Sequence, residues 1–209
     1  AIDDANTLYY CYVNGDGHPR VRVGNKLGDG SLSWGIDTDL GSDHGLVNAT
    51  FAEAIGGDAG RASCGFLGTN APGPNYQSRD FPGVWYLYIA TTLDGGQTWT
   101  TVNATPNDPV QGVGGIWQQG GSGDTNNNRN LLDFNEVTMD EKGRVLFGYN
   151  DGCVGACDGD PDGSPTYVAS MRVVRQTGGK TLRAAFDNVL AVDRVPGAAC
   201  LSGGNAGSD

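Results

Sequence analysis

The apolar residues of this chain occur in short segments bounded by Gly, Asn, Asp, Thr and Pro, and a helical spacing of apolar positions is hard to find. Segments of this kind are typical of short β-strands that are joined by tight turns. The pattern therefore predicts an all-β fold. In the clearest region we expect four strands, at about 49–55, 61–68, 84–93 and 98–103.

The same pattern repeats 83 residues later in the chain. The matching positions are Phe51 and Phe134, Glu53 and Glu136, Gly60 and Gly143, Gly65 and Gly148, and Gly95 and Gly178. A fixed offset that persists without a gap is the signature of a repeated structural unit. The second copy predicts four further strands, at about 132–139, 144–150, 166–176 and 181–187.

A four-stranded antiparallel meander that repeats along a sequence indicates the blades of a β-propeller. The chain then divides into a partial blade at 1–48, a full blade at 49–103, a long inter-blade loop at 104–131, a second full blade at 132–187, and a closing strand with a flexible tail at 188–209. Propellers close with about four to eight blades. We therefore expect the remaining blades to come from the same precursor, from another chain or from further copies.

The partial blade is expected to hold only the last three strands of its unit. These are Thr7–Val13, Pro19–Val23 and Ser31–Gly35. Beyond the second full blade, Asn188–Val192 is expected to form one more strand. That strand either closes the ring or pairs with the first, strand-deficient blade.

The most specific motif is Thr92-Leu93-Asp94-Gly95-Gly96-Gln97-Thr98-Trp99, which follows a predicted strand. The two glycines suit the positive φ angles of a tight hairpin, and an Asp at this place can accept backbone N–H groups within the turn. The stretch resembles the Asp-box (BNR) repeats of sialidase-like β-propellers, and the chain looks like a C-terminal part of one. The resemblance implies a structural role for Thr92, Asp94, Gly96, Thr98 and Trp99, not a catalytic one.

Two further stretches are degenerate versions of this motif. Residues 29–34 end on Trp34, and in the second copy Thr177 replaces the Asp and Leu182 replaces the Trp.

The resemblance also implies a binding face opposite these hairpins, built from 36–48, 67–84, 104–131 and 150–165. Aromatic, amide and arginine side chains in these loops suit a sugar-binding surface. The candidate binding residues are Tyr76, Arg79, Trp117, Gln118 and Arg129. The alternative is that the aromatic residues pack beneath their own loops.

A metal site is predicted at Asp158, Asp160 and Asp162, since the spacing D-x-D-x-D-G lets three carboxylates converge on calcium. The alternative is a solvated acidic turn. Cys153 and Cys157 bracket the preceding Gly-rich loop and are expected to form a disulfide in an oxidising compartment. The pairing of Cys11, Cys64 and Cys200 stays open.

The remaining charged candidates do not assemble into a catalytic motif. Glu53 and Glu136 recur on first strands, where a carboxylate could act as a base, bind a cation or bridge to the next blade. A sialidase would use arginines, a Tyr nucleophile and an acid, for which a fragment offers Arg79, Arg129, Glu136 and Tyr149. No stretch matches that family's catalytic motifs, so we assign no catalytic residue. Arg61, Arg144, His18 and His44 are interpreted as structural or surface residues.

The charge balance narrows the function. Lys and Arg number 13 against 24 Asp and Glu, a net charge of −11, which argues against nucleic-acid binding. No apolar run is long enough to span a bilayer. We expect an extracellular, cell-surface or periplasmic binding or scaffold module that recognises glycans and is stabilised by calcium. The alternatives are an exo-glycosidase of the sialidase type completed by blades outside this chain, and a structural subunit of an extracellular assembly.

Overall fold

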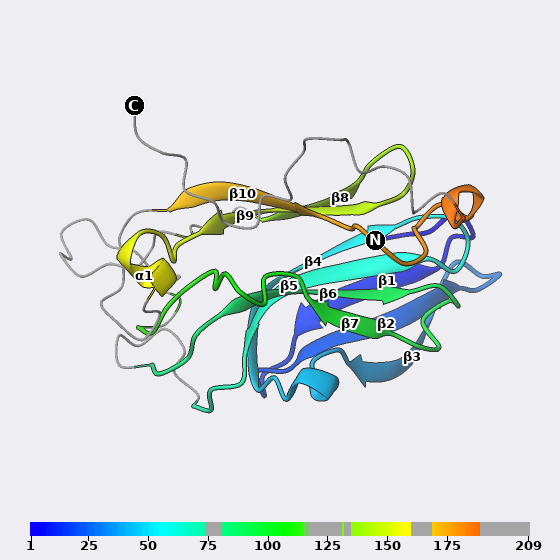
Figure 1. Ribbon diagram of the computed structural model, residues 1–209. Coiled ribbons are helices and arrows are strands. Elements are labelled where there is room, and N and C mark those ends of the chain that lie inside the picture. Colours follow the sequence, from blue (N-terminus) through cyan, green and yellow to red (C-terminus); the bar gives the residue numbers. More distant parts are fainter. Residues whose placement is uncertain (74–80, 115, 117–130, 132–134, 160–168, 189–209) are drawn as a thin grey trace, which may run out of the picture.

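The computed structural model describes residues 1–73, 81–114, 116, 131, 135–159 and 169–188. It confirms an all-β fold made of three antiparallel sheets, none of them closed (Figure 1). The first sheet has the order β1-β2-β3, the second β4-β5-β6-β7 and the third β10-β9-β8. In every sheet, neighbouring strands in space are also neighbours in sequence, as in a meander.

The elements have the following bounds. The strands are β1 (Leu8–Val13), β2 (Pro19–Lys26), β3 (Leu32–Asp39), β4 (Asn48–Gly56), β5 (Ala62–Thr69), β6 (Tyr86–Thr92), β7 (Thr100–Asn103), β8 (Glu136–Met139), β9 (Val145–Asp151) and β10 (Ser170–Arg175). The short helices are η1 (Ser42–His44), α1 (Ala156–Gly159) and η2 (Ala184–Phe186).

The first predicted repeat is present as the four-stranded second sheet. The second repeat differs, because the segment 181–187, predicted as a fourth strand, contains the helical turn η2 instead. Its side chains are held by the β4–β5 turn: Arg183 pairs with Asp58 at 2.9 Å, and the Asp187 carboxylate accepts two hydrogen bonds from Arg61. These tertiary contacts outweigh the local strand pattern. In the described part of the chain, the third sheet therefore has three strands.

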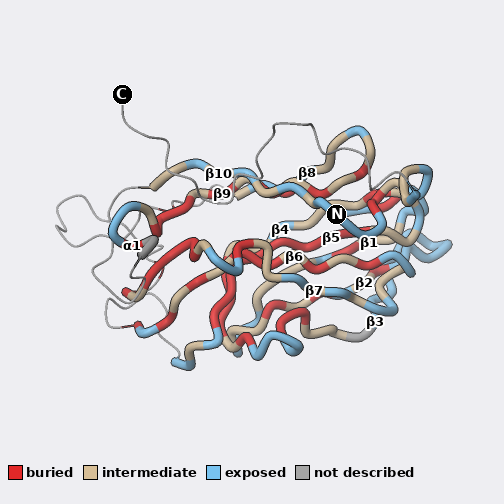
Figure 2. The backbone as a smooth tube through the Cα atoms, viewed as in Figure 1, coloured by how far each residue is buried: buried red, intermediate tan, exposed pale blue. Residues whose placement is uncertain are grey.

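The second sheet lies between the other two, and both of its faces are covered (Figure 2). All eight residues of β5 are buried, which explains its near-continuous run of small and apolar residues. One buried cluster joins it to the first sheet through Val21, Phe66 and Tyr88. The other joins it to the third sheet through Leu87 and Phe147.

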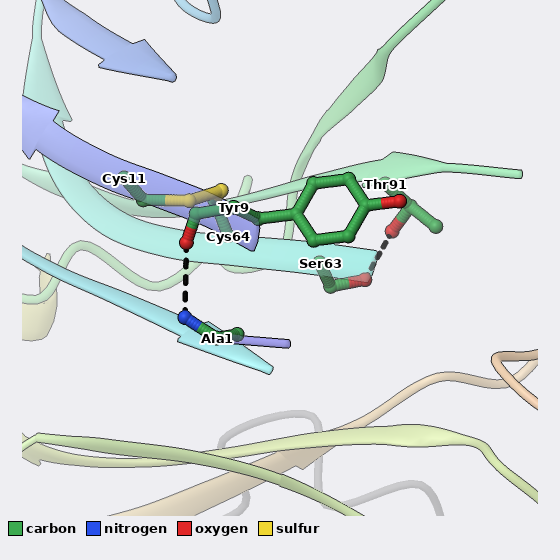
Figure 3. Close-up of a disulfide and its surroundings, with 6 residues drawn as sticks. All are labelled: Ala1, Tyr9, Cys11, Ser63, Cys64 and Thr91. Carbon is green, nitrogen blue, oxygen red and sulfur yellow. Dashed lines mark hydrogen bonds between the residues drawn. A yellow bond between two sulfur atoms is a disulfide. The ribbon is translucent and has the colours of Figure 1, made fainter. Parts of the chain in front are cut away.

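A disulfide also links the first two sheets. Cys11 of β1 bonds Cys64 of β5, with their Cα atoms 6.1 Å apart (Figure 3). Nearby, the Ala1 amino group donates to the Tyr9 carbonyl at 2.9 Å and fixes the N-terminus. The predicted pair Cys153–Cys157 is also at disulfide distance, with a Cα separation of 4.9 Å. Two such pairs are compatible with an extracellular or periplasmic location. None of the helices in the described ranges could cross a membrane.

The Thr92–Trp99 hairpin joins β6 to β7 and is held by its own side chains. The Asp94 carboxylate accepts the Thr98 N–H at 3.0 Å, and the Thr92 hydroxyl accepts the Gly96 N–H at 2.9 Å. Gly95 and Gly96 have φ angles of 76° and 85°. The Trp99 ring packs at its edge against Tyr9, so this indole contacts the first sheet as well as its own hairpin. The family resemblance remains a prediction.

We expect Asp94→Ala to lower the free energy of unfolding by about 1 kcal/mol, the usual net value for lost hydrogen bonds at a turn. Hydrogen bonds from Thr98 lower the pKa of Asp94 to about 2. The stabilisation is therefore present above pH 3.8 and is lost as the pH falls through about 2. Urea unfolding of wild type and variant at several pH values measures this. Asp29→Ala is the matched control, because Asp29 contacts only Ser31 in the degenerate motif.

Candidate binding site

The tight hairpins and the longer connections lie at opposite ends of the sheets. In Figure 1 the β6–β7 hairpin and the β8–β9 turn are at the right, and the connections that follow β5 and β9 are at the left. All five predicted binding residues, Tyr76, Arg79, Trp117, Gln118 and Arg129, fall outside the described residues. The described residues at the same end nevertheless enclose a pocket.

The pocket has a volume of about 870 Å³. It lies between the β1–β2 turn, the start of β4 and the end of the 70–73 segment. Residues of several chemical types line it: Tyr12, Asn14, Asp16, His18, Asn48 and Phe51. The family resemblance placed 47–48 and 72–73 on the binding face and did not include the β1–β2 turn. The signal was the run Asn14-Gly15-Asp16-Gly17, which is typical of a tight turn.

Gly17 allows the β1–β2 turn to lie against β4. Its φ is +88°, and a Cβ at this position would lie 2.5 Å from the Val47 carbonyl oxygen and 2.9 Å from Asn48 Oδ1. Only glycine fits so close to another backbone. Asn48 is held in turn, since its amide donates to the carbonyls of Ala71 and Gly73 at 2.9 and 3.1 Å. The pocket wall is therefore fixed by backbone contacts.

The polar side chains of the pocket are orientated by ion pairs. His18 Nδ1 lies 2.7 Å from Asp39, and the Asp16 carboxylate accepts a hydrogen bond from Arg20 at 2.9 Å. The Tyr12 hydroxyl donates to Asp37, and the Tyr12 ring stacks on Tyr10 with ring centres 5.1 Å apart. None of the residues that line the pocket in the described structure is Lys or Arg. The pocket therefore offers hydrogen-bonding groups and rings, and it carries no lining cation.

Phe51 marks a strained backbone position in this pocket. It has a φ of 55°, in the left-handed region that non-glycine residues rarely occupy. The β4–β5 register shifts between Thr50 and Glu53, so Phe51 lies within a β-bulge. Such strain costs on the order of 1–3 kcal/mol and is frequent at ligand sites. Together with the polar lining, this favours a binding role for the pocket.

A second cavity of about 660 Å³ lies between β6–β7 and β10. Its walls are mainly threonine and aliphatic side chains, including Ile89, Val102 and Val174. Its polar residues are mostly threonines together with Arg175, Gln176 and Lys180, and its described lining holds no carboxylate or imidazole, so we regard it as the weaker candidate.

A buried carboxylate lies at the end of β9. Asp151 is 1% exposed, accepts the Cys153 N–H at 3.0 Å and pairs with Arg172 at 3.2 Å. Burial raises its pKa to about 6, although the Cys153 and Arg172 contacts act in the opposite direction. Burial also raises the pKa of the neighbouring Tyr149. The contacts tie β9 to β10 and to the following loop, which indicates a structural role.

The raised pKa predicts how Asp151 affects stability with pH. The folded state favours the protonated acid, so wild type loses stability relative to Asp151→Asn as the pH rises from 3.8 through about 6. Urea unfolding of both proteins between pH 4 and pH 8 measures the difference. A difference that stays constant across this range would contradict the raised pKa.

The structure also shows the contacts or strand positions of the other charged and tyrosine residues considered from the sequence. Arg61 binds Asp187 and the Thr181 carbonyl, and Arg144 pairs with Asp140 at 2.7 Å, so both are structural. Glu136 pairs with Gly148, and Tyr149 is the next residue along β9. Successive side chains of a strand point to opposite faces. Glu136 and Tyr149 therefore lie on opposite faces of the third sheet and do not converge on one substrate.

The predicted calcium site lies outside the described structure. Asp160 and Asp162 fall in residues that are not described, as does the side chain of Asp158. Within the described ranges, no group of three or more His, Cys, Asp or Glu could hold a metal ion. Calcium stays a prediction from the sequence.

Comparison with known proteins gives no relative. No family model matches the chain, and neither the curated proteins nor the solved structures contain a match.

Proposed function

We propose that the chain is a propeller-type binding module, located outside the cytoplasm, that recognises neutral glycans in the pocket between the β1–β2 turn and β4. The observation that supports this best is the pocket lining. Residues with carboxylate, imidazole and amide side chains line it (Asp16, His18 and Asn14), and Tyr12 and Phe51 are also among the lining residues. A pyranose ring stacks its C–H face on an aromatic ring and directs its hydroxyls to polar groups around it.

Charge decides which glycans fit. The described residues that line this pocket include a carboxylate and no Lys or Arg, and the neighbouring Arg20 binds Asp16. Within the described lining a sugar carboxylate would face Asp16 and no Lys or Arg, and the net charge of −11 would repel it. The proposal is therefore a neutral hexose chain and not a sialylated one. The opposite placement of Glu136 and Tyr149 likewise gives no support to a sialidase-type site.

A glycan array tests this function, with the histidine in the pocket replaced. We expect His18→Ala to weaken binding of the preferred glycan about tenfold, the effect of losing one good hydrogen bond. His44→Ala is the matched control, because His44 Nε2 contacts the Thr101 carbonyl at 2.9 Å, away from the pocket. Asn14→Ala, whose side chain is exposed, should also weaken binding. Binding to no glycan at all would contradict the function; equal binding by all three variants would contradict the site.

A further inference from the structure

One internal contact shows how two sheets of this molecule stack. The fully buried Phe147 of the third sheet packs against Gly65 of the second sheet. A Cβ atom added to Gly65 would lie 2.3 Å from the Phe147 ring. Ile89, the β6 partner of Gly65, borders the same hollow, since its Cδ1 atom would lie 3.1 Å from that Cβ. A glycine between larger neighbours thus receives an aromatic ring from the next sheet.

The third sheet has an equivalent hollow at Gly148, and no described residue fills it. The 83-residue repeat places Gly148 where Gly65 stands, and Gly148 pairs with Glu136 as Gly65 pairs with Glu53. A Cβ on Gly148 would meet no atom closer than 4.0 Å. Beside it, Val173 and Met171 are 63% and 77% exposed. We call Gly148, Met171 and Val173 the front face.

The first sheet offers the complementary surface. On the side away from the second sheet, Tyr10 and Trp34 are 58% and 43% exposed, with ring centres 6.3 Å apart. We call Tyr10 and Trp34 the back face. Large exposed aromatic side chains on a soluble protein mark an interaction surface.

The back face resembles the face of the third sheet that is covered inside this molecule. In the third sheet, buried Tyr149 stands opposite Arg172, which pairs with Asp151 at 3.2 Å. In the first sheet, Tyr10 stands opposite Arg22, which pairs with Asp37, also at 3.2 Å. The same aromatic, cation and carboxylate combination is therefore covered by the second sheet in one case and open in the other.

We propose that two copies of this chain associate head to tail, with Tyr10 and Trp34 of one copy seated over Gly148 of the other. Each copy contributes one front face and one back face, so a two-fold arrangement satisfies both faces of both copies. The three sheets of each copy would give a ring of six, within the range of about four to eight that closes a propeller. The proposal does not depend on glycan binding.

The test is the mass in solution by light scattering or sedimentation. We expect twice 21.7 kDa at high protein concentration. Because each copy carries a charge of −11, added salt should strengthen the association by screening. A 21.7 kDa species at all protein and salt concentrations would overturn the proposal.

Two variants test the faces separately. Gly148→Val fills the hollow with a residue that suits a strand, and we expect it to weaken dimerisation at least tenfold. Tyr10→Asp should do the same from the back face. The control is Gly28→Val, because Gly28 lies in the β2–β3 connection and a Cβ there meets no atom within 4 Å. Circular dichroism of each variant establishes that it is folded.

A mixture of the two variants distinguishes a head-to-tail dimer from dimers that form through other contacts. Gly148→Val keeps an intact back face and Tyr10→Asp an intact front face, so the mixture should regain one of the two contacts and a measurable fraction of dimer. Front-to-front pairing would leave Tyr10→Asp fully dimeric, and a contact elsewhere would leave both variants dimeric. Either result would overturn the proposal.

Discussion

Replacing Cys64 by Ala is expected to lower the free energy of unfolding by about 4 kcal/mol. Cys11 and Cys64 are 53 residues apart in sequence, and cross-linking a chain segment of this length removes loop entropy worth about 4 kcal/mol from the unfolded state. The bond also joins β1 to β5, between two sheets that share no strand. The measurement is urea unfolding under non-reducing conditions.

The second disulfide provides the internal comparison. Cys153 and Cys157 are separated by 4 residues, so the same entropy relation gives Cys153→Ala a loss of about 2 kcal/mol. In a reducing agent, wild type and Cys64→Ala should have nearly equal stability. If Cys64→Ala lost the same stability with and without reductant, packing and not the cross-link would be responsible.

Asp3→Ala is expected to cost about 3 kcal/mol, because it leaves several buried donors without a partner. The carboxylate is 4% exposed and accepts hydrogen bonds from the N–H groups of Ala5 and Thr7, from the Tyr9 hydroxyl, and from the Gly60 N–H at 2.7 Å. It thereby ties the N-terminal segment to the β4–β5 turn. Thermal or urea unfolding at neutral pH measures the loss.

The pKa of Asp3 gives this prediction a pH window. Burial alone would raise the pKa, but the hydrogen bonds from Thr7 and Gly60 keep it below 3.8. The stabilisation is therefore fully present above pH 3.8 and is lost as the pH falls below that value. Asp4→Ala is the matched control: the Asp4 side chain is 64% exposed and its carboxylate pairs with Arg183 at the surface, so we expect little change. Equal losses in both variants would contradict the role of Asp3.

The sequence predicts the local strands of this fold well where one hairpin follows another. The expected bounds of β4 to β7 agree with the structure within two residues, because alternation and turn glycines act over short distances. Alternation and turn glycines do not predict the structure of residues 181–187 correctly. Its structure is decided by Arg61 and Asp58, more than 100 residues earlier in the chain, and no local pattern reports such partners.

The binding site was harder to predict for a related reason. The pocket forms only because Gly17 lets one turn approach the start of a strand some 30 residues later. A single sequence shows the glycine and the polar side chains, and it does not show which strand lies opposite them. The aromatic and arginine residues that the sequence suggested for glycan binding, such as Tyr76 and Trp117, lie outside the described residues. Their role therefore stays a prediction.

The most direct test of glycan recognition is an NMR titration of ¹⁵N-labelled protein with the glycan that the array selects. We predict that amide shifts concentrate in 14–18 and 47–52, the segments that line the pocket, while β9 and β10 stay unchanged. Shifts confined to 74–80 and 117–130 would place binding in the loops that the sequence first suggested and would contradict the pocket.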